Sequence, residues 1–288
     1  MKLPLNESME LTEKEKRGGI ILPFIATIIA IAIGEVVLLP FGFAESSETP
    51  TMLENLMGLF ADIVPIIIIL LFCRIIEKRS LPSLGIKRKN FAKDYVMGAL
   101  VGLVLISITF FINYITNSIH ISFNSKGISW TFVILSIFAY MIQSFNEELI
   151  CRGLLMNSIS SRKGPIAGIL INAIFFGILH LFSPGVTVLS FSNVILFGLI
   201  FSLIFYKTNS LWFVSAIHFI WNYFQGVIYG AQVSGLSLYS SVFKTEPVAG
   251  RELLNGGAFG FEGGLTVTII ILIAIMIAFV IVNNRVQD

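Results

Sequence analysis

The segment Trp130-TFVILSIFAYMIQSFNEELICRGLLM-Asn157 decides the fold, because it is long and apolar enough to cross a membrane and yet contains three ionisable side chains. Glu147, Glu148 and Arg152 lie within six positions of one another. At the centre of a spanning helix each such group costs roughly 2.5–3.5 kcal/mol on insertion scales. A chain that carries all three there is expected to use them, so this cluster is the first candidate for a functional site.

The composition of the whole chain is that of an integral membrane protein. Of its 288 residues, 56% are hydrophobic and 12% are charged, whereas soluble domains carry about 25% charged residues. The mean hydropathy is +0.88. The formal net charge of +2 is too small to indicate nucleic-acid binding. Cys73 and Cys151 have no CxxC partner and are interpreted as buried thiols.

Eight segments can each cross about 30 Å of hydrocarbon as a helix of about 20 residues. They are residues 19–41, 56–76, 95–115, 130–157, 164–182, 189–206, 211–229 and 265–282. The sequence therefore predicts an all-α, polytopic membrane protein of about eight transmembrane helices. We expect a single membrane domain over residues 1–288, with a long loop at 230–264 before the last span.

The positions of lysine and arginine predict how the chain is oriented in the membrane. They are concentrated in alternate connections, at residues 14–17, 74–93, 162–163, 207 and 285. The first apolar run is too long for the h-region of a cleavable signal and is interpreted as a retained span. We therefore predict a multi-pass protein of the cell membrane with both termini in the cytoplasm.

Four polar side chains on three predicted spans reach a similar depth. Glu147 lies 14 residues before the predicted turn at 161–164 and His180 lies 16 residues after it, which places them about 21 and 24 Å along an antiparallel hairpin. His218 and Asn222 lie about 12 and 18 Å from the start of the seventh span. Because they are four residues apart, they share one face of their helix. The sequence predicts that all four line one polar cavity in the membrane interior.

The two adjacent glutamates cannot serve the same purpose, because they are about 100° apart around the helix. Glu148 and Arg152 are spaced i,i+4 with the acid first, which favours an ion pair. This assignment leaves Glu147 to meet His180, although the reverse assignment of the two glutamates stays open. The structural alternative is an ion-pair lock between helices, with the histidines and Asn222 as interhelical hydrogen-bonding groups.

Other polar residues of the spans give weaker signals, and so does the remaining histidine. Glu35 and Asp62 are expected to be solvated or paired with each other near the outer ends of their spans, and His120 to be a surface loop residue. Gln143, Asn146, Asn172 and Gln225 are interpreted as packing or cavity-lining groups.

The predicted cavity suits the attack of water on an amide. A carboxylate and an imidazole can polarise a water molecule, and an amide with a second imidazole can donate hydrogen bonds to the developing oxyanion. The chain has no HExxH zinc motif. No cofactor is favoured, but a divalent metal such as zinc is an alternative, with Glu147, His180 and His218 as three ligands and an open fourth position.

Three motifs in the chain resemble those of a known family. They are Glu147-Glu148-x-x-x-Arg152, Phe176-x-x-x-His180 and His218-x-x-x-Asn222, in this order on separate spans. They resemble the CPBP family of CAAX proteases and bacteriocin-processing enzymes, also called Abi or Rce1-type intramembrane endopeptidases. The resemblance covers residues 81–229, including the basic stretch Leu84-Gly85-Ile86-Lys87-Arg88.

The resemblance implies an eight-helix membrane protease with assigned roles for the motif residues. Glu147 and His180 would activate the water, and His218 with Asn222 would form the oxyanion site. Glu148 and Arg152 would support them. Family members have been described both as metalloproteases and as metal-free glutamate peptidases, and the metal-free mechanism is the one expected here.

The expected function is intramembrane endopeptidase activity on a membrane-presented peptide, in pheromone or bacteriocin processing or in self-immunity. The expected partners are this peptide or protein substrate and the lipid bilayer, without nucleic acid, and the sequence defines no oligomeric state. The alternative is a non-enzymatic transporter or immunity scaffold that uses the same buried polar set as an ion or proton site. Transporters often show paired halves or broken helices, and the sequence indicates neither.

Overall fold

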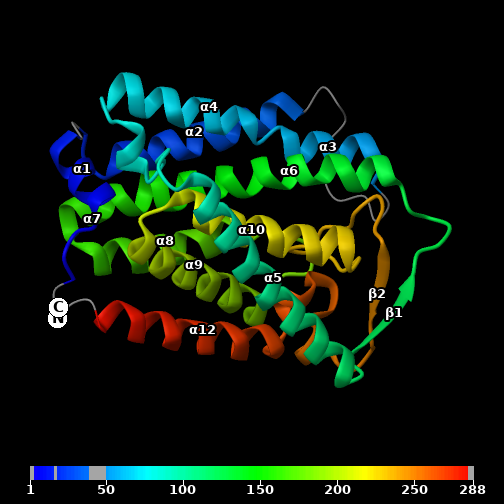
Figure 1. Cartoon of the computed structure of the whole chain (residues 1–288). Coiled ribbons are helices and arrows are strands. Elements are labelled where there is room, and N and C mark those ends of the chain that lie inside the picture. The colour runs from blue at the N-terminus through cyan, green and yellow to red at the C-terminus, as the bar shows by residue number, and fades with distance from the viewer. Residues whose placement is uncertain (1–2, 16–17, 39–49, 285–288) are drawn as a thin grey trace.

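The computed structural model describes residues 3–15, 18–38 and 50–284, which are mostly helical (Figure 1). Within these ranges, five helices are long and apolar enough to cross a membrane: Ile21–Leu38, Met52–Ile76, Phe91–Ile115, Trp130–Lys163 and Val188–Thr208. The apolar helices Pro165–Leu179 and Leu265–Ile281 are shorter. The predicted helical membrane fold is confirmed at this level, and the number of eight spans stays a prediction.

Each predicted span corresponds to helical structure. The first three are α2 (Ile21–Leu38), the pair α3 (Met52–Phe60) and α4 (Ile63–Leu71) with a π-helix at Phe72–Ile76, and α5 (Phe91–Ile115). The next three are α6 (Trp130–Glu148) with a π-helix (Leu149–Met156) and α7 (Asn157–Lys163), then α8 (Pro165–Leu179) and α9 (Val188–Thr208). The last two are α10 (Leu211–Tyr223) with a π-helix (Phe224–Ile228), and α12 (Leu265–Asn284). The predicted end of the first span, 39–41, lies outside the described residues.

The hairpin between α7 and α8 turns where the sequence predicts it. Gly164 has a φ of 85°, a conformation that favours glycine, and Pro165 occupies the first helical position of α8. The flanking helix ends differ from the prediction, because α7 continues to Lys163 and α8 already ends at Leu179. His180 is therefore the C-terminal cap of α8 and not a mid-helix residue.

The second predicted span lies within the apolar helix Met52–Ile76, which contains a short irregularity near its middle. A turn at residues 61–62 separates α3 from α4. Pro65 has no N–H to donate to the carbonyl of Ala61, and Val64 N donates to that carbonyl instead, over 2.9 Å. The interruption leaves Asp62 at the N-terminus of α4, beside the pocket described below.

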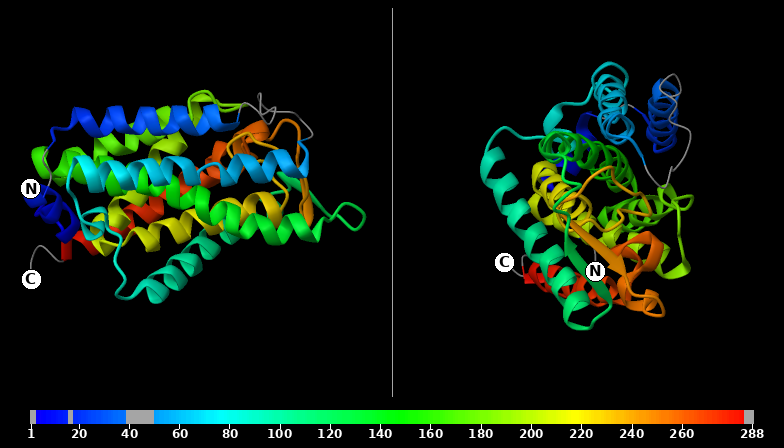
Figure 2. Two further views of the ribbon diagram at one scale, coloured as in Figure 1. Left: turned by 90° about the horizontal axis from the view of Figure 1, so that it is seen from above. Right: turned by 90° about the vertical axis from the view of Figure 1, so that its right-hand side faces the viewer.

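Helix α10 carries two of the predicted site residues and lies between α5 and α6 (Figures 1 and 2). Glycines let α5 approach the α10 backbone closely, as is common between membrane helices. A Cβ atom placed on Gly98 would lie 2.2 Å from the carbonyl oxygen of Phe213, and one on Gly102 would lie 2.7 Å from that of Ile217. The position of α10, and with it that of His218 and Asn222, therefore depends on this contact.

The first and last helices meet at one end of the bundle (Figure 1). Just before α1 (Glu7–Glu15), Asn6 Nδ2 donates to the carbonyl of Tyr206 at the end of α9, over 3.2 Å. Next to Tyr206, Lys207 Nζ donates to the carbonyl of Ile281 in α12, over 2.7 Å. The end of α9 thus contacts both the segment before α1 and the C-terminal part of α12.

The 230–264 segment is more ordered than a long loop, and it makes the fold not entirely α-helical. Its strand β2 (Phe243–Pro247) pairs antiparallel with β1 (Ile119–Phe123), so that His120 lies opposite Glu246. It also contains α11 (Glu252–Asn255) and 3₁₀ turns at Gly257–Phe259 and Phe261–Gly263. The alternating Ile-His-Ile-Ser-Phe sequence of β1 is the pattern expected of a strand.

Candidate active site

One pocket of about 860 Å³ brings the four predicted catalytic side chains together. Glu147 comes from α6, His180 from the end of α8, and His218 and Asn222 from α10. Three separate helices thus contribute to one polar surface, as the depth comparison along the hairpin predicts.

Glu148 and Arg152 form an ion pair behind this pocket, which confirms the predicted pairing. Arg152 Nη1 lies 3.1 Å from Glu148 Oε1, and both side chains have no exposed surface. Arg152 Nη2 donates to the carbonyl of Gly198 over 3.1 Å. The guanidinium also lies over two aromatic rings, 4.6 Å from the centroid of Phe176 and 5.4 Å from that of Phe201. The arginine is therefore held by the ion pair, one backbone carbonyl and two aromatic rings, and it is not among the residues that line the pocket.

The imidazole of His218 lies between the two glutamates. Its Nδ1 lies 2.9 Å from Glu148 Oε1, and its Nε2 lies 3.8 Å from Glu147 Oε2. Because an ionised carboxylate only accepts hydrogen bonds, Nδ1 carries a proton and donates a hydrogen bond to Glu148. The buried ion pair thus orients His218 so that Nε2 points toward Glu147.

The position of His180 corrects one detail of the prediction. Within the described residues, no hydrogen bond or ion pair joins Glu147 to His180, and the imidazole beside Glu147 is that of His218. His180 Nδ1 lies 3.0 Å from the carbonyl oxygen of Phe176, its neighbour one turn earlier. A carbonyl only accepts, so Nδ1 is protonated and Nε2 of a neutral His180 is an acceptor.

Gln143 connects the two halves of the site, and its role is not evident from the sequence. Its amide nitrogen donates to Glu147 Oε1, one turn later on α6. Its amide oxygen accepts a hydrogen bond from Asn222 Nδ2 on α10, over 3.1 Å. The i,i+4 spacing to Glu147 is the signal that sequence reasoning could have used. Gln143 therefore fixes one carboxylate oxygen of Glu147 and leaves the other oxygen unengaged.

That other oxygen, Oε2 of Glu147, is buried and has no hydrogen-bond partner in the described part of the chain. A buried polar atom without a partner costs free energy, and in native proteins such atoms call for an explanation. The Glu147 side chain as a whole is 22% exposed, whereas Glu148 is fully buried. Of the two adjacent glutamates, Glu147 is thus the one accessible from the pocket.

The outer part of the pocket contains further carboxylates. Asp62 accepts a hydrogen bond from Asn146 Nδ2 over 2.7 Å. The sequence analysis expects Asp62 to be solvated or paired with Glu35, whereas its hydrogen-bond partner is this amide. Glu262, from the segment before α12, accepts hydrogen bonds from the backbone N and Oγ of Ser234 at 2.8 and 3.0 Å. Burial raises the pKa of Glu262 above its ordinary value, against the opposing effect of these hydrogen bonds. Sequence reasoning did not single out Glu262, because only the tertiary fold brings it to the pocket.

A π-helical stretch begins directly after Glu148 and ends at Met156. Such wide turns occur frequently at functional sites. Here the stretch is completely buried and includes Arg152. Cys151 is in the same stretch, and both it and Cys73 are buried and form no disulfide, as predicted.

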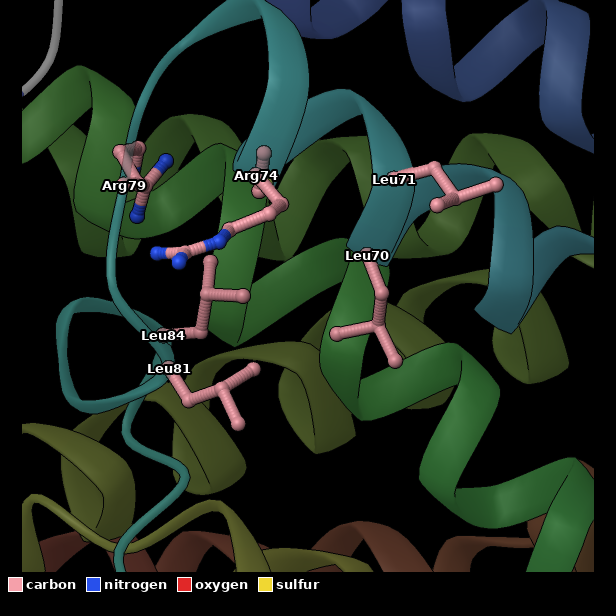
Figure 3. A pocket seen from close by; sticks show the side chains of 7 residues that line it. Leu70, Leu71, Arg74, Arg79, Leu81 and Leu84 are labelled. Atoms are coloured by element: carbon pink, nitrogen blue, oxygen red, sulfur yellow. The ribbon is translucent and has the colours of Figure 1, made fainter.

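Among the residues that the structure describes, no three His, Cys, Asp or Glu side chains are grouped so that they could hold a metal ion. The predicted alternative of Glu147, His180 and His218 as zinc ligands therefore receives no support from their arrangement, and no chemical step is assigned to a metal. A second pocket, of about 400 Å³, lies near the cytoplasmic end predicted for α4 (Figure 3). Its lining combines leucines with Arg74 and Arg79 and contains none of the predicted catalytic residues.

Comparison with known proteins identifies the central part of the chain. Residues 128–224 match the family model described as Type II CAAX prenyl endopeptidase Rce1-like. The match includes all seven motif residues, and the wider limits of 81–229 stay a prediction. A search of curated proteins finds no significant match. Together with the apolar helices, the family match supports a multi-pass membrane endopeptidase in general terms. Residues 128–224 are therefore similar to the Rce1-like CAAX endopeptidase family, as the motifs predict.

Proposed function

We propose that this chain is an intramembrane endopeptidase of about eight transmembrane helices, which hydrolyses a peptide bond held in the pocket around Glu147. The observation that carries the proposal is the unpartnered Glu147 Oε2, 3.8 Å from His218 Nε2, in a pocket also lined by His180 and Asn222. Polar groups more than 3.5 Å apart are commonly bridged by water. A water molecule bound between these atoms would be the nucleophile.

In this mechanism Glu147 is the general base. Its Oε2 removes a proton from the water, with Nε2 of a neutral His180 as a second acceptor on the same pocket wall. The water oxygen attacks the carbonyl carbon of the scissile peptide bond and gives a tetrahedral intermediate. When this intermediate collapses, the C–N bond breaks and the proton held by Glu147 passes to the leaving nitrogen. The products are one new carboxylic acid and one new amine.

His218 and Asn222 would stabilise the oxyanion of the intermediate. His218 lies next to Glu147 and Glu148, and two nearby carboxylates favour a positively charged imidazole whose Nε2–H can donate. Asn222 uses Nδ2 to bond Gln143 and has a second N–H on the same nitrogen. Donors fixed before the reaction act strongly in a site that excludes water. Glu148 and Arg152 act as positioning residues, because they fix His218.

The proposed substrate is a membrane-presented peptide, such as a peptide pheromone or a bacteriocin, in processing or in self-immunity. The proposed location is the cell membrane, with both termini cytoplasmic and no nucleic-acid partner. The substrate proposal is supported by the family match and by a pocket that several helices line, and the proposed orientation is supported by the positions of lysine and arginine in the sequence. Prenylation of the substrate is not part of the proposal.

The direct test compares the wild-type protein with Glu147→Gln in detergent, on candidate membrane peptides. Loss of general-base catalysis should lower kcat by about 10²–10⁴-fold. Glu54→Gln is the matched control, because Glu54 also lines the pocket but caps α3 through Thr51, and glutamine can replace glutamate in such a capping box. Equal cleavage by the wild type and Glu147→Gln would refute the role of Glu147. Loss of cleavage in chelator, with recovery on adding zinc, would replace the metal-free mechanism by the one in which Glu147, His180 and His218 bind the metal.

One observation favours the non-enzymatic alternative. The interruption between α3 and α4 lies at Asp62, which lines the pocket, and helices broken beside a central site are typical of transporters. Proteoliposomes with a pH-sensitive dye inside would distinguish the two functions. Proton or ion flux that Glu147→Gln abolishes, in the absence of any peptide cleavage, would favour the transporter.

A further inference from the structure

The charge of the pocket lining is strongly one-sided. Five carboxylate side chains line it, and no lysine or arginine does, among the residues that the structure describes. The carboxylates are Glu35, Glu54, Asp62, Glu147 and Glu262. His180 and His218 also line the pocket, and His218 lies beside Glu147. In low-dielectric surroundings a carboxylate without a nearby cation is costly. A bound cation would offset this cost.

Asp62 is the carboxylate whose geometry is most informative. It occupies the N-cap position of α4, where aspartate usually accepts a hydrogen bond from the first turn of the helix, yet its side chain makes no such bond. It accepts one from Asn146 Nδ2 instead, over 2.7 Å. Asp62 also lies within electrostatic reach of both Glu35 and Glu147. No ion pair joins Asp62 to a basic side chain in the described ranges.

Asn146 supplies an independent observation. It is 4% exposed and lines the pocket, and its Oδ1 has no hydrogen-bond partner among the residues that the structure describes. Asn146 directs Nδ2 toward Asp62 Oδ1, which is the orientation that suits an ionised carboxylate, because such a group only accepts hydrogen bonds. An acceptor without a donor thus lies beside a carboxylate without a cation. Ammonium and guanidinium groups carry only donors, so they complement both atoms at once.

We propose that Asp62, Asn146 and Glu35 form a subsite for a lysine or arginine side chain of the peptide substrate. The inference rests on the proposed endopeptidase function. Asn146 directly precedes Glu147 on α6, and an extended peptide advances only about 3.3–3.6 Å per residue. The basic residue therefore lies within one or two residues of the bond that is cleaved. A substrate with a basic residue there would be preferred over one with an apolar residue of the same size.

The test uses fluorogenic acylated decapeptides in which a single lysine is moved along an alanine–leucine background. Matched series carry norleucine or glutamate in place of the lysine. We measure kcat/KM with the wild type, and the Kd of the same peptides with Glu147→Gln, which separates binding from cleavage. A charge-assisted hydrogen bond corresponds to about tenfold or more in either constant. We expect lysine peptides to have this advantage over norleucine peptides at one or two adjacent positions. Glutamate peptides should have the lowest kcat/KM and the highest Kd.

Two variants locate the preference within the pocket. Asp62→Asn should reduce the ratio between lysine and norleucine peptides toward one, and Asp62→Lys should invert it in favour of glutamate peptides. The control Glu54→Gln, which removes a charge from the same pocket, should keep the ratio. Equal values for lysine and norleucine peptides with the wild type overturn the subsite, and so does a ratio that Glu54→Gln reduces as much as Asp62→Asn does. If no peptide is cleaved but the Kd values retain the lysine preference, the subsite stands and the proposed hydrolysis fails.

Discussion

Removal of the Arg152 guanidinium should destabilise the protein strongly, because the buried Glu148 carboxylate then keeps only its bond to His218. Both side chains of the Glu148–Arg152 pair have no exposed surface. Breaking such a pair by removing one partner costs about 3–5 kcal/mol, whereas replacing both partners by uncharged groups of similar volume is often close to neutral. We therefore expect Arg152→Met to be much less stable than the double variant Glu148→Gln/Arg152→Met.

The size of the effect can be stated as a melting temperature. Chains of more than about 150 residues lose about 2 °C in Tm for each 1 kcal/mol, so Arg152→Met should melt about 6–10 °C below the wild type. Cys73 and Cys151 are 2% and 0% exposed, and a thiol-reactive dye therefore reports unfolding in detergent. The control is Lys87→Met, which breaks the exposed pair with Glu7 and should cost at most about 1 kcal/mol.

Two results would refute this reasoning. One is an Arg152→Met variant that melts within about 2 °C of Lys87→Met, which would mean that water or a local rearrangement compensates the buried charge. The other is a double variant that is less stable than Arg152→Met, which would mean that the stacking of the guanidinium on Phe176 and Phe201 outweighs the charge. In both outcomes the ion pair would not be the main stabilising contact behind the pocket.

Three further predictions follow from other parts of the structure. Gln143→Leu should lower kcat by about tenfold or more with little change in KM, because it releases Glu147 and Asn222 from their shared partner; steady-state peptide hydrolysis measures both constants. Burial raises the pKa of Glu262 in the folded protein, so the folded state binds this proton more tightly than the unfolded state does. The free energy of unfolding should therefore fall as pH rises above the ordinary pKa of 4.5. In Tm measurements between pH 4.5 and 8, Glu262→Gln should remove this contribution to the fall in Tm. Gly98→Leu should prevent correct packing of α5 on α10 and lower the yield of monodisperse protein in size-exclusion chromatography, whereas Gly58→Ala, where a Cβ meets nothing within 4 Å, should not.

The helices were predictable because lipid imposes a simple constraint, whereas their ends and interruptions depend on tertiary contacts. An apolar run of sufficient length must be helical in hydrocarbon, and each predicted span is indeed helical. The end of α8 at Leu179 was not predictable from hydropathy, because Leu181 and Phe182 continue the apolar run although they lie in an exposed turn. The break before α4 follows from Pro65, which the sequence shows but which many membrane helices tolerate.

The candidate site was also predictable in part from the sequence, and the rest of it depends on tertiary contacts. Spacing within one helix correctly predicted the pair of Glu148 with Arg152, and depth along a hairpin correctly placed His180 in the same pocket as Glu147. Rotation of one helix relative to another is not encoded in spacing. For this reason the sequence left open which imidazole would lie beside Glu147, and the structure places His218 there.

The neighbouring glutamates show why a single helix can supply both a reactive group and its support. Because Glu147 and Glu148 are about 100° apart around α6, one reaches the pocket and the other reaches Arg152 in the sealed interior. Each glutamate has one oxygen without a hydrogen-bond partner among the described residues, but the Glu148 side chain is fully buried and bonded to Arg152 and His218 through Oε1, whereas Glu147 lines the pocket. Exchange of the two roles would require α6 to rotate by about 100° about its axis. That rotation would turn Arg152 toward the pocket and break the bond between Glu148 and His218. Because Glu147 lines the pocket and Glu148 does not, Glu147 is the glutamate that we propose as the base, while Glu148 orients His218 on α10.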